Sequence, residues 1–305
     1  MKNEIKKFLA YNGRVSITCA MTTELVDEAR KIHDLTPVST AALGRLLTMA
    51  TIMGSDLKDE EDNITLQIKG NGPIGTMVAV VNGDMKVKGT VGNPYVDIPL
   101  NEFGKLDVGM AVGNDGFLNV IKDLGLKKPY IGIVPLSSGE IAEDFARYFT
   151  ESEQTKSAVA LGVLVNKDGV KSAGGYLVSA MPDATDEDIT NLEKNIFEAG
   201  AISRMLDEGL SLYEIARKIT GDKDVKIIQE NIDAKYECDC SEEKMKKALS
   251  TIGKKQLKEI LEEDGKAEMT CHFCNKKYTV SKEELENMIK NLKEENKIIE
   301  FPNKK

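Results

Sequence analysis

Residues 237–244 read ECDCSEEK and residues 270–278 read TCHFCNKKY, which places four cysteines near the end of the chain: Cys238, Cys240, Cys271 and Cys274. The first pair has C-x-C spacing, the second has C-x-x-C spacing, and thirty residues separate the pairs. Four thiolates grouped in this way can close a tetrahedral zinc shell, and the same sulfurs can be oxidised to two disulfides. The pattern predicts one Zn²⁺ per reduced chain, bound by these four residues, at a site that is also open to redox chemistry.

A small domain is expected around the cysteines, over residues 233–305. Helical patterns cover residues 242–252 and 254–263, and Ser281 opens a third helix with a capping box. Short strand-like segments flank the C-x-x-C. The domain has few large apolar side chains, so its core alone is marginal, whereas structural zinc contributes roughly 10–16 kcal/mol in small peptides. We therefore expect zinc loss to unfold this domain.

Upstream, the chain of 305 residues with 41% hydrophobic content is long enough for two or three domains. Turn dipeptides predict three antiparallel hairpins in a β-rich domain over residues 1–182. They are Asn82-Gly83, Asp115-Gly116 and Asp168-Gly169, of which the second would join strands at Met110–Gly113 and Phe117–Lys122. Two helices are predicted within this domain, one from Pro37 to Met53 and one near residues 140–149.

The pattern changes from strands to helices after Met181-Pro182. Apolar residues at helical spacing, among them Leu192 and Ile196, predict a helical linker domain over residues 183–232 that packs on the β-rich domain. The fold class expected is therefore α+β, with a β-rich N-terminal domain with packed helices, a helical linker domain and a small C-terminal zinc-binding domain.

Charge and composition exclude several classes of protein. The net charge of -9 opposes nucleic-acid binding, and from Glu237 onward fifteen lysines face fifteen acidic residues. The first ten residues carry charges and lack the apolar run of a signal peptide, and no later stretch is apolar enough to span a membrane. The expected compartment is the cytoplasm, where thiols stay reduced and clustered cysteines favour a metal or a reactive site over a structural disulfide framework.

Other candidate residues are assigned structural roles. Gly70, Gly72 and Gly75 form a G-x-G-x-x-G motif, but the residues after it are β-prone and open no helix, so no nucleotide site is predicted. Cys19 is expected to be a small buried hydrophobe, His33 to be structural, and His272 to be a bystander between two zinc ligands. The methionines, including Met49, Met53, Met77 and Met85, are expected to fill the core.

The chain resembles the heat-shock protein 33 family of redox-regulated chaperones, also called the 33 kDa chaperonins. The C-x-C, the thirty-residue gap and the C-x-x-C match the signature of that family. So do GTVGNP at residues 89–94, Gly174-Gly175-Tyr176 and Met181-Pro182. The resemblance covers essentially the whole chain.

The resemblance implies a non-enzymatic stress-response chaperone that needs no ATP and is inactive when it is reduced and zinc-bound. Oxidative stress would form the disulfides Cys238-Cys240 and Cys271-Cys274, release zinc, and unfold the C-terminal region and the linker. The partners implied are unfolding client proteins, with a homodimer in the oxidised form, and neither nucleic acid nor membrane.

Two alternatives stay open from the residues themselves. A zinc-ribbon module for nucleic-acid or transcription partners would need basic surface around the cysteines. A thiol-disulfide oxidoreductase would use Cys271-His272-Phe273-Cys274, but such a motif normally lies at a helix N-terminus, whereas here a hairpin is predicted.

Overall fold

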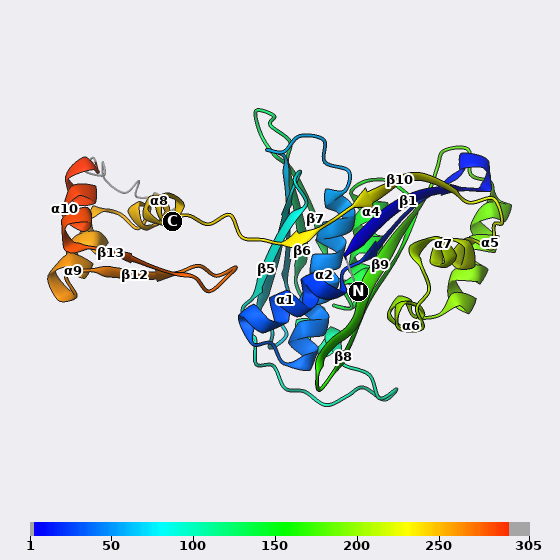
Figure 1. The fold of residues 1–305 in the computed structure, drawn as a ribbon, viewed down its shortest axis with the longest axis horizontal. Coiled ribbons are helices and arrows are strands. Elements are labelled where there is room, and N and C mark those ends of the chain that lie inside the picture. The colour runs from blue at the N-terminus through cyan, green and yellow to red at the C-terminus, as the bar shows by residue number, and fades with distance from the viewer. Residues whose placement is uncertain (1–2, 293–305) are drawn as a thin grey trace, which may run out of the picture. The chain divides into compact units, whose positions relative to one another are not determined.

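The computed structural model describes residues 3–292 and confirms the α+β class (Figure 1). The chain divides into two compact units, Met1–Cys238 and Asp239 onward. The linker helices belong to the first unit, and the division of that unit at residue 182 stays a prediction. The helices of residues 3–292 are each too short or too polar to cross a membrane.

Two antiparallel sheets form the body of the first unit. The five-stranded sheet has the order β10-β1-β2-β9-β8. Its strands are β1 (Glu4–Ala10), β2 (Val15–Met21), β8 (Ser157–Asn166), β9 (Gly169–Ala180) and β10 (Lys226–Ile232). The six-stranded sheet has the order β11-β5-β4-β3-β6-β7, in which only β11 pairs in parallel. Its strands are β3 (Asn63–Lys69), β4 (Thr76–Asn82), β5 (Lys86–Val91), β6 (Phe117–Asp123), β7 (Tyr130–Pro135) and β11 (Lys235–Tyr236).

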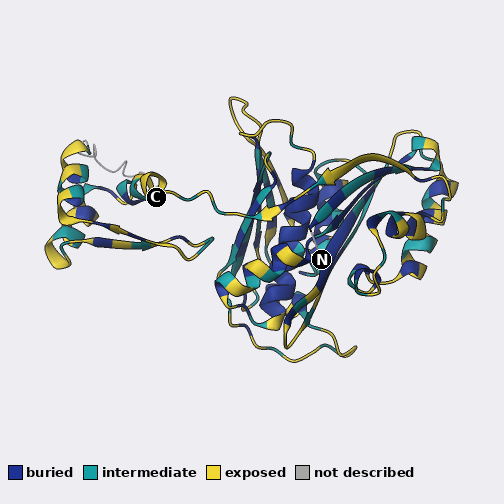
Figure 2. Ribbon diagram, viewed as in Figure 1, coloured by how far each residue is buried: buried dark blue, intermediate teal, exposed yellow. Residues whose placement is uncertain are grey.

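Helix α2 (Pro37–Gly54) lies between the sheets and contacts strands of both (Figures 1 and 2). Nearly all of its residues are buried, so it presents apolar side chains in every direction, as expected for a helix enclosed by a core. The remaining helices of the body are α1 (Thr23–His33), α3 (Val108–Val112) and α4 (Ala142–Glu151), with a 3-10 turn at Tyr11–Gly13. The four methionines singled out above are buried in this core, which confirms their packing role.

Three helices follow strand β9 in the chain: α5 (Asp186–Ala199), α6 (Ile202–Asp207) and α7 (Leu212–Thr220). Leu192 and the apolar residues of α6 and α7 share one hydrophobic cluster with Phe8, Ile17 and Tyr176 of the five-stranded sheet. The helical region therefore packs on the β-rich domain, as its apolar periodicity predicts.

A polar contact reinforces this docking. Arg14, next to β2, donates two hydrogen bonds to the carboxylate of Asp188, at 2.7 and 2.9 Å. Asp188 also accepts from the backbone N–H of Thr185 in the capping box that begins α5. The hydrogen bonds from Arg14 hold the pKa of Asp188 well below its usual range.

The second unit contains α8 (Glu242–Ser250), α9 (Lys254–Glu263), the hairpin β12 (Ala267–Thr270) and β13 (Lys277–Val280), and α10 (Lys282–Asn291). The buried side chains of its hydrophobic cluster are Leu249, Leu257, Ala267, Val280, Leu285 and Ile289. The capping box at Ser281 is present as predicted. So small a core agrees with the expectation that a metal supplies part of the stability.

The hairpins at Asn82-Gly83 and Asp168-Gly169 are confirmed, but the one at Asp115-Gly116 is wrong. Residues 108–112 form α3 because the side chain of Asp107 accepts a hydrogen bond from the Met110 backbone N–H and caps a helical turn. The sequence analysis also missed α1.

The G-x-G-x-x-G motif precedes strand β4, which confirms that it lacks the helix of a dinucleotide site. Its glycines have a packing role. A Cβ at Gly70 would lie 2.1 Å from the carbonyl oxygen of Val112, and one at Gly72 would lie 2.3 Å from that of Ala111. The loop can approach the end of α3 only without these side chains.

Candidate metal centre

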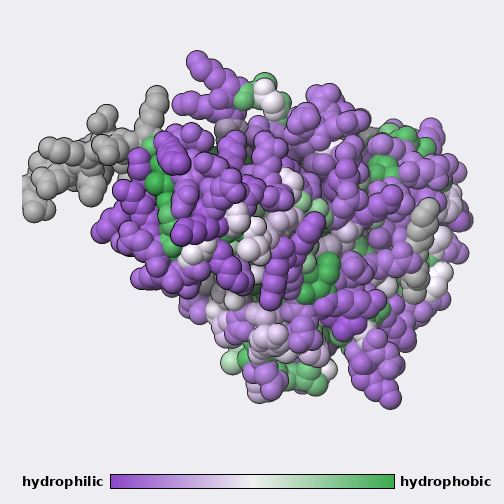
Figure 3. All heavy atoms as spheres, turned by 60° about the vertical axis from the view of Figure 1, so that its left-hand side comes forward, coloured by the Kyte–Doolittle hydropathy of each residue, from purple (hydrophilic) through white to green (hydrophobic). Residues whose placement is uncertain are grey.

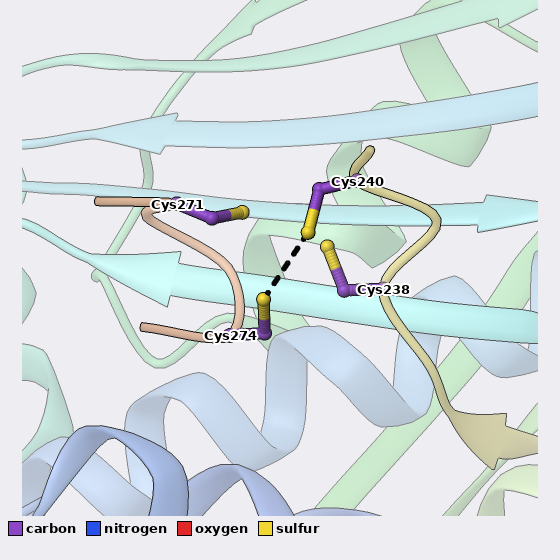
Figure 4. Close-up of side chains that lie close together, drawn as sticks. All are labelled: Cys238, Cys240, Cys271 and Cys274. Atoms are coloured by element: carbon purple, nitrogen blue, oxygen red, sulfur yellow. Dashed lines mark hydrogen bonds between the residues drawn. The ribbon is translucent and has the colours of Figure 1, made fainter. Parts of the chain in front are cut away.

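The four cysteines predicted as ligands lie together in the structure. The Sγ atoms of Cys238, Cys240, Cys271 and Cys274 are all within 4.8 Å of one another. Figure 4 shows the four side chains pointing toward one another, two from each of the chain segments. Four sulfurs at about 2.3 Å from a tetrahedral zinc would be about 3.8 Å apart. The observed cluster has the size and the donor atoms of such a shell.

Local backbone structure positions the second pair. Cys271 follows β12 directly, and the turn that leads into β13 contains Cys274. The Cys271 N–H donates to the Lys276 carbonyl oxygen at 2.9 Å, and the Asn275 N–H donates to the Cys271 carbonyl oxygen at 2.8 Å. Asn275 has a φ of 57°, a conformation that asparagine tolerates well. The C-x-x-C is thus a hairpin knuckle, as predicted, and it does not begin a helix.

Tyr278, on β13, joins the two cysteine pairs. Its hydroxyl lies 3.1 Å from the Cys240 Sγ and donates to the Cys240 carbonyl oxygen, also at 3.1 Å. The contact with Cys240 and burial raise the pKa of Tyr278. The Sγ atoms of Cys240 and Cys274 are 3.4 Å apart. The sequence analysis did not identify Tyr278, because a tyrosine in a short strand carries no signal of proximity to a thiol.

Electrostatic contacts join the helices around the knuckle. Lys246 of α8 lies 2.5 Å from a carboxylate oxygen of Glu284 at the start of α10 and also pairs with Glu242. The ammonium group lowers the pKa of Glu284 to about 2. These contacts are solvent-accessible and add little to stability, so they orient the helices more than they hold the unit together.

The fifth cysteine and the two histidines do not belong to the cluster. Cys19 is fully buried in β2, and burial raises the pKa of its thiol, so the prediction of a small buried hydrophobe is confirmed. Within residues 3–292 the cluster contains the four cysteines and not His272. His33 is buried, and its Nε2 lies 3.0 Å from the Tyr236 hydroxyl, a partner that the sequence did not indicate.

The fold and the site define a β-rich protein with a four-cysteine centre, able to bind a metal ion, in the C-terminal part of the chain. A family model described as Hsp33 protein matches residues 3–281. The chain belongs to the Hsp33 family of chaperones.

Individual relatives agree with this assignment. A 33 kDa chaperonin of Clostridium botulinum is 50% identical over 293 residues, covering 95% of this chain and 99% of that protein. The 33 kDa chaperonin of Clostridioides difficile is 48% identical over 292 residues, covering 96% of this chain and 100% of its own. The crystal structure of the 33 kDa chaperonin from Thermotoga maritima superposes with a TM-score of 0.86 at 41% identity, covering 95% of this chain and 98% of that one. These relatives are named as chaperonins and not as enzymes.

Proposed function

We propose that this protein is a redox-regulated, ATP-independent chaperone, a holdase that binds unfolding proteins and prevents their aggregation. It is inactive when reduced and zinc-bound, and oxidation activates it. The observation that carries the proposal is the grouping of four sulfurs within 4.8 Å in a member of the Hsp33 family. In a reducing compartment such as the cytoplasm, this set of thiols stays ready for metal binding.

Zinc is the metal proposed, with Cys238, Cys240, Cys271 and Cys274 as its four ligands. Thiolates are soft ligands that select zinc over magnesium or calcium, and a complete set of four is typical of structural zinc sites. When bound, the ion would hold the sulfurs as thiolates and cross-link the two segments that carry the cysteine pairs. Its binding energy would then be folding energy for a unit with only a small core.

The redox step proposed is the oxidation of four thiolates to the disulfides Cys238-Cys240 and Cys271-Cys274. Two molecules of hydrogen peroxide accept four electrons and four protons and become four molecules of water. Formation of each disulfide begins when a thiolate attacks peroxide and becomes a sulfenic acid. The neighbouring thiol then attacks the sulfenic sulfur, which forms the disulfide and releases water. Oxidation of the sulfurs to disulfides would remove the thiolate ligands, so a metal ion held by these four cysteines would be released.

Release of the metal would be coupled to client binding through the linker. In this proposal residues 1–182 form the client-binding body, residues 183–232 the linker and residues 233–305 the sensor. Strand β10 is exposed along nearly its whole length, and its pairing with β1 is interrupted by register shifts. It is therefore a weak connection between the sensor and the linker helices. Undocking of these helices would expose their apolar faces and the sheet surface around Phe8 and Tyr176.

Light scattering of a client that unfolds on heating tests the proposal. One sample contains the reduced, zinc-loaded protein and the other the peroxide-treated protein. Suppression of aggregation only after oxidation, reversed by a dithiol, is the expected result. Equal behaviour of the two samples would refute redox control. Sedimentation of both forms measures whether the oxidised protein is the homodimer that we propose.

A further inference from the structure

A cleft of about 760 Å³ lies between the linker segment of residues 200–207 and the β-rich domain. One wall is helix α6 with the two residues before it, and the opposite walls are formed by α2, β8 and the loop around Lys105. Pockets of 300–1,000 Å³ are typical of sites for small organic ligands. The cleft is therefore large enough for such a ligand, and none of its lining residues belongs to the cysteine centre.

The deep part of the cleft is apolar. Ala41, Leu161 and Ile202, which line it, are buried, and Val163 is half-buried beside them. An aliphatic chain against these side chains would lose contact with water, at a gain of roughly 25 cal/mol for each Å² of apolar surface covered.

Positive charge lies around this apolar lining. Arg45, Lys105 and Arg204 line the cleft, and Asp207 is the only acid among its lining residues. Arg45 pairs with Glu140, and Asp207 pairs with Lys171 at 2.8 Å. Among residues 3–292, neither Lys105 nor Arg204 forms an ion pair. Two uncompensated cations therefore remain at this cleft, on a chain whose net charge is -9.

A buried donor of Arg45 is also unused. Its Nε has no hydrogen-bond acceptor within the described residues, although it is shielded from solvent. Buried donors in proteins are nearly always paired, so this Nε is an exception in a residue that lines the cleft. It adds to the positive character of this wall.

We propose that this cleft binds a small anionic amphiphile, a carboxylate on a medium-length aliphatic chain. The carboxylate lies near Lys105 and Arg204, and the chain lies on the apolar wall formed by β8 and α6. A nucleic acid does not fit this chemistry, because the cations are few and the lining is apolar.

Binding in the cleft is coupled to linker docking, because α6 forms one of its walls. The docked position of α6 is fixed by a hydrogen bond of 2.7 Å from the Ser172 hydroxyl to the Ser203 carbonyl oxygen. When α6 leaves, the cleft no longer exists, so the ligand binds only the docked state. Amide exchange that requires undocking then slows by the factor 1 + [L]/Kd, about 11-fold at a ligand concentration of ten times Kd.

Calorimetric titration of the reduced, zinc-loaded protein with decanoate tests the inference, with decanol as the uncharged ligand of the same chain length. We expect one saturable site per chain for decanoate and at least tenfold weaker binding of decanol. The double variant Lys105→Gln/Arg204→Gln should bind decanoate at least tenfold more weakly. The control Lys58→Gln/Lys223→Gln makes the same charge change at exposed positions outside the cleft and should bind normally.

Hydrogen exchange of residues 202–207 gives the second measurement. Decanoate should slow exchange there in the natural protein and in the control, but not in the double variant at the same concentration. Equal affinity for decanol and decanoate, equal affinity of the two double variants, or no saturable binding would overturn the proposal. Both measurements use the reduced protein and involve no client, so their outcome is independent of the holdase function.

Discussion

Replacement of Leu192 by glutamate should undock helix α5 from the β-rich domain. Leu192 is only 7% exposed and belongs to the hydrophobic cluster that joins the helices to the five-stranded sheet. Phe197, on the same helix, is 89% exposed. Glutamate is as good a helix former as either residue, so the two variants differ in what they remove from the interface and not in helix propensity.

The magnitude follows from the burial of Leu192. Complete burial of a leucine side chain contributes about 1.5–3 kcal/mol, and a factor of ten in an equilibrium corresponds to about 1.4 kcal/mol. Loss of this contact should raise the population of the undocked state by about 10- to 150-fold. A glutamate carboxylate cannot be buried there without a further desolvation cost, so this range is a lower bound.

Hydrogen exchange of α5 and light scattering of a heat-unfolded client, both under reducing conditions, measure this effect. Leu192→Glu should exchange faster throughout α5 and should suppress client aggregation without oxidant. Phe197→Glu should match the natural protein in both assays. If the two variants behave alike, the buried face of α5 is not what keeps the chaperone inactive.

Four further results are expected. Cys274→Ser should lower zinc affinity and leave the protein either partly active without oxidant or unable to stay in its active form after oxidation. Normal zinc content with a normal response to oxidant would contradict the role of Cys274 as a ligand. A zinc chelator applied to the reduced protein should remove the helical circular dichroism of the second unit while the β signal of the first remains, and an unchanged spectrum of the metal-free protein would show that zinc is dispensable for folding. The contact with Arg14 lowers the pKa of Asp188, so its contribution to docking is complete above the unfolded pKa near 4 and is lost as pH falls toward the lower folded value. Hydrogen exchange of α5 should therefore become faster below about pH 4. The variant Asp188→Asn should make this pH dependence flatter. Tyr236→Phe, which removes the hydrogen bond to Gly89, should lower the temperature at which the oxidised protein becomes active, and an unchanged temperature in the client assay would exclude Tyr236 as a restraint.

The cysteine cluster was predictable from sequence because residue type and spacing alone indicate it. Thiols occur in few roles in a reducing compartment, so the spacing of Cys238, Cys240, Cys271 and Cys274 alone indicated one cluster. The knuckle and the capping box at Ser281 follow equally from short-range rules.

Other elements depend on contacts that short-range patterns do not encode. Strand β10 pairs with β1, more than two hundred residues earlier in the chain, and its side chains are exposed, so no alternation of apolar residues marks it. Helix α1 did carry signals, with Leu25, Val26 and Ala29 on one face and Arg30 in its last turn, but they follow directly on a strand and were not recognised. The partnership of Arg14 with Asp188 belongs to the same class of long-range contact.

The position of Tyr236 limits how far unfolding would spread from the cysteines in the proposed activation. Its hydroxyl donates to the Gly89 carbonyl oxygen at 2.8 Å and lies 3.0 Å from the His33 Nε2, so it ties β11 to the body only two residues before Cys238. Unfolding that starts at the cysteines would have to break these two hydrogen bonds before it could reach β10 and the linker helices. Because these partly buried hydrogen bonds must break together with the short β11 pairing, heat would add to the effect of oxidation in the proposed activation. A sensor built in this way, if it works as proposed, would respond more fully to oxidation combined with heat than to oxidation alone.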